Sequence, residues 1–144
     1  MSDPINKEIL VVGLVLANST FTRIPELVFG EQEENTISVD LKAQIDDNPK
    51  FMTHMHFEFL SKNKDIEQIK AVVDYAGIFE NNGLTKEEKK NFAYINAPSI
   101  MFPFVRQHVF SMFSLASLKD IYLPLINFVK LAEEKGYLKE ETAK

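Results

Sequence analysis

The chain has 144 residues, 45% of them apolar and 26% charged, which suits one hydrophobic core, so we predict a single domain over residues 1–144. Its net charge of −5 argues against nucleic acids and anionic membrane surfaces as main partners, because both attract clusters of Lys and Arg. The absence of cysteine excludes disulfides, thiolate metal sites and a cysteine nucleophile, and it is compatible with a reducing cytoplasm, where we expect the protein to act.

The first apolar run is ILVVGLVLA, residues 9–17. It is too short to cross a bilayer, and Asp3 and Glu8 stand where a signal peptide needs basic residues, so we expect no stable membrane insertion. We predict a buried β-strand here, in which Gly13 marks a bulge or a close approach of the backbone.

Three more strands are predicted downstream. Residues 36–45 (TISVDLKAQI) alternate between apolar and polar, residues 50–60 (KFMTHMHFEFL) are rich in strand-favouring aromatics, and residues 66–79 (IEQIKAVVDYAGIF) end in β-branched and aromatic residues. Polar turns at 46–49 and 61–65 separate them. Consecutive strands joined by short turns most simply pair antiparallel.

The periodicity then becomes helical. Thr85 and Glu88 have the spacing of a capping box, and residues 98–115 carry apolar side chains at three- and four-residue steps, with Pro103 tolerated in the first turns. A last helix starts at Asn127 and stops at Gly136. We predict an α+β fold, with an antiparallel sheet over roughly 1–80, a helical layer over 85–136 and a polar tail over 137–144.

The inventory of reactive groups does not favour an enzyme. His54 and His56 point to one face of a strand and resemble half of a metal site, but the sequence shows no further ligands, and a solvated or packed pair is the better interpretation. His108 lies among apolar residues and suits an interface or the core. No glycine-rich phosphate loop or nucleophile elbow is present, and the acidic cluster at 31–35 reads as a solvated loop. We expect no catalytic residue, cofactor or metal.

The chain has more apolar residues than are needed to cover one face of a sheet with one layer of helices. The first strand, the long helix and the aromatic segments around it all carry them, although many of the 12 phenylalanines suit the core of a small domain. The surplus favours self-assembly, binding of an apolar partner, or both.

Three segments resemble the SecB family of protein-export chaperones. These are AGIF (76–79), APSIMFPFVRQ (97–107) and YLPLINFVKL (122–131), which are similar to the family's G-G-I-F turn, its P-N-I-L-F-P-Y-A-R-E helix start and its L-x-P-V-N-F segment. The order of elements, four strands and then two helices, also agrees.

The resemblance implies a homotetramer built as a dimer of dimers and an ATP-independent holdase that keeps precursor proteins unfolded for export. It implies that the long helix starts around Pro98, Ile100, Phe102, Pro103 and Arg106. It assigns the client groove to Phe21, Phe79, Phe104, Tyr122, Leu123 and Phe128, although each of these taken singly suits the core better. It assigns the oligomer interface to Phe104, His108, Phe110, Met112 and Phe113.

Three alternatives stay open. The first is a SecB-like chaperone that serves export or is dedicated to an antitoxin or another single partner. The second is a homo-oligomer without chaperone activity. The third is a small-molecule enzyme or binding protein that uses the face with His54 and His56. Among acidic residues that could meet the family's SecA motor, only Asp74 lies close to AGIF, so a SecA contact is possible but doubtful.

Overall fold

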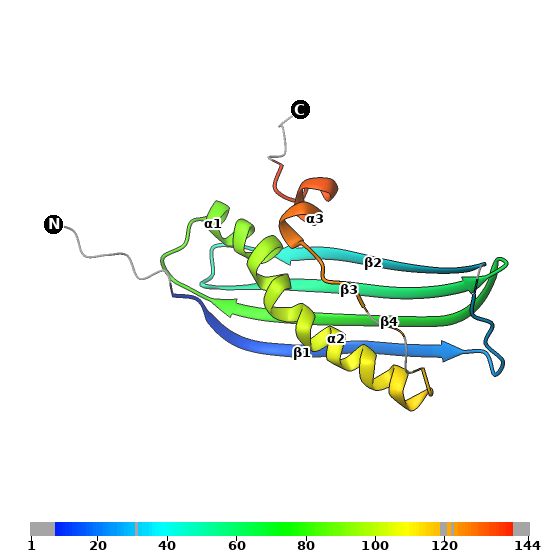
Figure 1. Ribbon diagram of the computed structural model, residues 1–144. Helices are drawn as coiled ribbons and strands as arrows, with labels where there is room; N and C mark the ends of the chain where they lie inside the picture. The colour runs from blue at the N-terminus through cyan, green and yellow to red at the C-terminus, as the bar shows by residue number, and fades with distance from the viewer. Residues whose placement is uncertain (1–7, 31, 119–120, 122, 140–144) are drawn as a thin grey trace.

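In the computed structural model, four long strands form one antiparallel sheet, and the helices lie on one of its faces (Figure 1). The structure describes residues 8–30, 32–118, 121 and 123–139. The predicted α+β class, with four strands followed by a long and a short helix, is confirmed. The strands are β1 (Leu10–Arg23), β2 (Glu33–Gln44), β3 (Lys50–Asn63) and β4 (Ile66–Glu80); the helices are α1 (Lys86–Asn91), α2 (Ala97–Leu115) and α3 (Phe128–Lys135).

The strand order is β1-β4-β3-β2. Pairing between consecutive strands is therefore confirmed for β2 with β3 and β3 with β4, and it is wrong for β1, which pairs with β4. The reason lies in the connection: residues 24–32, which we call the crossover loop, are too long for a tight hairpin and lead the chain from one edge of the sheet to the other. Both β1 and β2 consequently have one free edge.

The core lies between the sheet and the helices, and the central strand β3 contributes alternate side chains to it. Every second side chain of this central strand is buried toward the helices, and α2 presents a buried stripe at helical spacing against it. Aromatic rings interlock across the layers, with ring centroids 5.2 Å apart for Phe59 and Phe113 and 6.0 Å apart for Phe57 and Phe102. The fully buried members from the two layers include Phe57, Met55, Val73, Met101, Val105 and Val109.

The prediction of a buried first strand is wrong for this chain on its own. Leu10 is 58% exposed and Val15 is 48% exposed, because β1 is an edge strand and much of its apolar surface has no covering layer. The expected irregularity near Gly13 is confirmed, since the register with β4 shifts between Val11 and Gly13 and again between Leu16 and Asn18.

The short helix predicted at residue 85 and the long helix form one continuous helical path. Thr85 and Glu88 form the expected capping box, and α1 then continues through a π-helical turn, Phe92–Asn96, into α2. Pro103 therefore lies inside a long helical path and not in its first turns. The wider π-helical turn ends just before Pro98, where a proline ring would crowd the carbonyl four residues earlier in a regular helix.

The last helix has the predicted ends. The Asn127 side chain accepts from the Lys130 N–H at 3.1 Å, and Gly136 closes α3 in the left-handed region with φ 68°. Within the described residues, no helix combines the length and the apolar character that a membrane crossing requires.

A close contact at Gly77 on β4 gives a test of this packing. A Cβ there would lie 2.8 Å from the Phe79 ring and 2.9 Å from the Met101 sulfur. We expect Gly77→Ala to lower the free energy of unfolding by about 1–3 kcal/mol, as overpacked cores do. Gly13→Ala is the matched control, because its nearest atom is 3.8 Å away. Equal stability of the two variants in urea denaturation would contradict the packing of α2 on β4.

Candidate functional site

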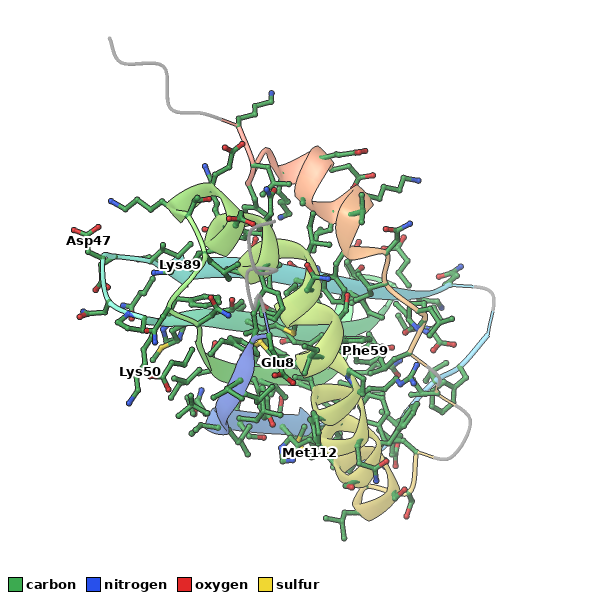
Figure 2. All side chains as sticks on the ribbon, turned by 90° about the vertical axis from the view of Figure 1, so that its left-hand side faces the viewer. Glu8, Asp47, Lys50, Phe59, Lys89 and Met112 are labelled. Atoms are coloured by element: carbon green, nitrogen blue, oxygen red, sulfur yellow. The ribbon has the colours of Figure 1, made fainter. Side chains whose placement is uncertain are left out.

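A groove of about 1270 Å³ lies on the helix face of the sheet, beyond the end of α2. The crossover loop, the start of β2 and the segment after α2 enclose it, and Phe59 of β3 forms part of its floor (Figure 2). Its apolar lining residues are Leu27, Phe29, Ile37, Phe59, Leu118, Ile121 and Pro124, and the polar side chains that also line it are Arg23, Glu33, Asn35 and Ser117. The groove exists because α2 and α3 leave this end of the sheet's apolar face uncovered.

Arg23 lines the groove, but its guanidinium is already occupied. Its Nη1 donates to the Ala116 carbonyl at 2.5 Å, and its Nε and Nη2 donate to the carbonyls of Ile24 and Pro25, each at 3.0 Å. Ala116 caps the C-terminus of α2, where a positive charge is favourable. Arg23 therefore ties the start of the crossover loop to the end of α2.

The free edge of β2 is closed along only part of its length. The hydroxyl oxygens of Tyr137 and Tyr94 accept from the Leu41 and Ala43 N–H groups at 2.9 and 3.1 Å, and the two rings stack at 4.7 Å. Because backbone direction alternates along a strand, the N–H groups of Asn35 and Ile37 point the same way. The described residues provide no hydrogen-bond partner for these two backbone donors, which lie beside the groove.

Three residues assigned to the client groove are buried instead. Phe79 is completely buried and packs edge-on against Phe92, Phe128 packs against Phe102, and Leu123 is also buried. Phe79 and Phe128 are thus core residues of this chain and are not accessible to a client. Large aromatics are the side chains that fill a core best, so choosing them by type selects core positions.

The other three assigned positions are also outside the groove or outside the described residues. Phe21 is half-buried against Phe113, with ring centroids 6.0 Å apart. Phe104 is 50% exposed on α2 and stacks on Tyr75. Tyr122 lies outside the described residues.

Several of the residues that line the groove were missed because they come from irregular segments. Leu27 and Phe29 belong to the crossover loop, and Ile121 follows α2, where neither a twofold nor a 3.6-residue period applies. The available signal was composition: Leu27, Val28 and Phe29 form an apolar triplet between Pro25 and Gly30 in a loop.

The positions assigned to the oligomer interface divide between two sides of α2. Phe113 is buried against Phe59 of its own sheet, so it is a core residue. His108 Nε2 lies 2.7 Å from the Ser19 hydroxyl oxygen on β1, and the same hydroxyl donates to the sulfur of Met112 at 3.4 Å. Phe104 lies on the exposed side, and Phe110 is partly buried.

His54 and His56 lie on the sheet face that carries no helix. His56 Nδ1 is 2.6 Å from Asp74 Oδ1 and His56 Nε2 is 3.6 Å from Glu58 Oε2. The hydrogen bond to Asp74 raises the pKa of His56 above its ordinary value, with Glu58 adding to the effect and burial opposing it. Within the described residues, no three His, Cys, Asp or Glu side chains are grouped as metal ligands. The contacts of His56 with Asp74 and Glu58 are ion pairs when its ring is protonated.

Comparisons with known proteins agree with this architecture. The sequence profile of the family described as "Preprotein translocase subunit SecB" matches residues 20–137. A protein-export protein SecB of Orientia tsutsugamushi (strain Boryong) is 32% identical over 120 residues, which cover 69% of this chain and 71% of that protein. One of Anaplasma phagocytophilum is 36% identical over 66 residues, 44% of this chain and 42% of that protein, so the chain spans less than half of this relative.

Among solved structures, a SecB-like chaperone of Mycobacterium tuberculosis, in complex with a peptide from an antitoxin, has the same fold. The TM-score is 0.71 at 13% sequence identity, with 83% of this chain and 91% of that chain covered. The profile match over most of the length and the shared fold establish that this chain is a member of the SecB family.

Proposed function

We propose that this protein is an ATP-independent holdase chaperone that binds unfolded polypeptides in the groove between the crossover loop and the start of β2. The observation that carries the proposal is an apolar groove beside an edge strand with unpaired backbone donors. An unfolded chain offers the matching chemistry, because it exposes apolar side chains and unpaired backbone groups together.

The groove suits many sequences because two of its polar side chains are engaged with each other: Asn35 Nδ2 donates to Glu33 Oε1 at 3.1 Å. Its apolar floor accepts any hydrophobic side chain, and its one arginine is held by three backbone carbonyls. The donors of Asn35 and Ile37 meet a client's backbone, which is the same in every sequence. Several weak contacts along one long client sum to stable binding through a high effective concentration.

Two client classes fit this proposal. Precursor proteins kept unfolded for export are the first, because the relatives from Orientia and Anaplasma are named protein-export proteins. A dedicated antitoxin or other single partner is the second, since the M. tuberculosis neighbour was solved with an antitoxin peptide. For either client class, we propose a binding protein that acts in the cytoplasm without catalytic activity.

We also propose that the chain assembles as a homotetramer, a dimer of dimers. The exposed side of α2, with Phe104 and Leu115, and the apolar residues of β1 are too extensive to remain in water on a single chain. Such surfaces are typical of interfaces between subunits. A contact with SecA, the further partner that the resemblance implies, would use the sheet face that carries Asp74.

Client capture tests the first proposal. We expect light scattering with size-exclusion chromatography to show a stable complex with reduced, carboxymethylated α-lactalbumin and none with the native form. Phe29, which is 54% exposed in the groove, is the position to change: Phe29→Asp places a charge on the apolar lining and weakens capture at least tenfold. Ile66→Asp is the control, because Ile66 is 62% exposed and does not line the groove. Equal loss in both variants would reject the groove as the binding site.

The assembly has its own test. Phe104→Asp introduces an unpaired charge at the proposed interface, which costs several kcal/mol, and we expect the molar mass in light scattering to fall below four chains. Val129→Asp on α3 is matched in exposure, since both side chains are 50% exposed, and we expect it to keep the parent mass. A parent protein that elutes as a monomer, or a Phe104→Asp variant with unchanged mass, would contradict this placement of the interface.

A further inference from the structure

Gln68 makes an unusual set of contacts with the crossover loop. This side chain on β4 is 2% exposed; its Oε1 accepts from the Val28 N–H at 2.5 Å, and its Nε2 donates to the Val28 carbonyl at 2.9 Å. The backbone carbonyl of Gln68 also accepts from the Ile24 N–H at 3.0 Å. One residue therefore holds the loop at its start and at its middle.

The local irregularity of the sheet explains how Gln68 reaches the loop. In the register of β3 with β4, Ser61 pairs with Ile69 and Lys62 pairs with Glu67, so Gln68 is the extra residue of a bulge. A bulge removes one residue from the ladder and turns its side chain in a new direction. Here it directs the side-chain amide at Val28, where the amide satisfies both backbone groups as a neighbouring strand would.

The residues on either side of Val28 are the two loop residues that line the groove. Leu27 and Phe29 both contribute to the lining, and their backbone position is fixed once Val28 is held. Asn63 Nδ2 also donates to the Val28 carbonyl, at a longer 3.3 Å. The described loop residues around Val28 have no helix or strand of their own, so these side-chain contacts replace secondary structure.

We propose that Gln68 is a positioning residue for the groove: it holds the crossover loop as a fixed wall, so that Leu27 and Phe29 are in place before a client arrives. This inference rests on the proposed client binding at the same groove. A loop that is ordered in advance does not lose conformational freedom on binding, and preorganisation of this kind raises affinity without a new contact. Gln68 itself does not line the groove, so its effect passes through Val28.

The main variant is Gln68→Met, which keeps the length of the side chain and removes both hydrogen bonds. We expect faster exchange of the Val28 amide hydrogen in NMR measurements without client, and about tenfold weaker binding of reduced, carboxymethylated α-lactalbumin, as expected when a few side chains must be ordered on binding. Gln44→Met makes the same change at an exposed position at the end of β2, away from the groove, and should alter neither quantity.

A second variant separates positioning from general destabilisation. In Gln68→Glu, the ionised carboxylate still accepts from the Val28 N–H but cannot donate to the Val28 carbonyl, whereas the protonated acid does both. Burial favours the protonated form. We therefore expect its deficit in client affinity, relative to the parent protein at the same pH, to shrink as the pH is lowered from 7 to 5. Because protonation also restores the stability that a buried carboxylate costs, urea denaturation at both pH values must show the variant fully folded; the change in client affinity then reflects the position of the loop.

Two results would overturn the inference while leaving the proposed function intact. They are parent-like affinity in Gln68→Met despite fast exchange at Val28, and unchanged exchange at Val28 in that variant. If the parent protein binds no unfolded probe at all, the proposed function fails and client positioning fails with it. The exchange of the Val28 amide without client then still decides whether Gln68 holds the loop.

Discussion

The packing of α2 across the middle of the sheet determines what the rest of the surface can do. Its buried stripe covers the central strands β3 and β4, and α3 extends the cover toward β2, but one layer of helices does not reach every part of four long strands (Figure 1). Two apolar regions remain. One is β1 with the outer side of α2, where we place contacts between subunits, and the other is the groove at the far end of the helix face.

Polar side chains determine which parts of the groove and of the strand edge beside it are accessible. Tyr94 and Tyr137 close part of the β2 edge, which would otherwise be a long template for uncontrolled strand pairing, and they leave its beginning available at the groove. Arg23 and Gln68 fix the opposite wall through backbone groups of the crossover loop. The shape of the groove thus depends on a few specific hydrogen bonds within the chain, and these bonds do not involve the client.

The sequence alone predicted the strands and helices, but it did not predict which of them lie side by side. Twofold alternation in β2, the strand-favouring aromatics of β3, the capping box at Thr85 and the cap at Asn127 are signals of local backbone geometry, and the structure confirms the elements that they predicted. The pairing of β1 with β4 was missed, because periodicity identifies a strand's faces and not the strand beside it. Groove residues such as Phe29 were missed because they lie in segments without a period, and Phe79 was chosen for its aromatic ring although the fold buries it.

The central claim is that unfolded chains bind at the groove and not elsewhere on the sheet. Amide hydrogen exchange of the full chain, with and without reduced, carboxymethylated α-lactalbumin, tests it most directly. The account predicts slower exchange on client addition at Asn35 and Ile37 and in the crossover loop, with no change around His56 on the helix-free face. Protection confined to the helix-free face, or no protection while a complex is present, would contradict it.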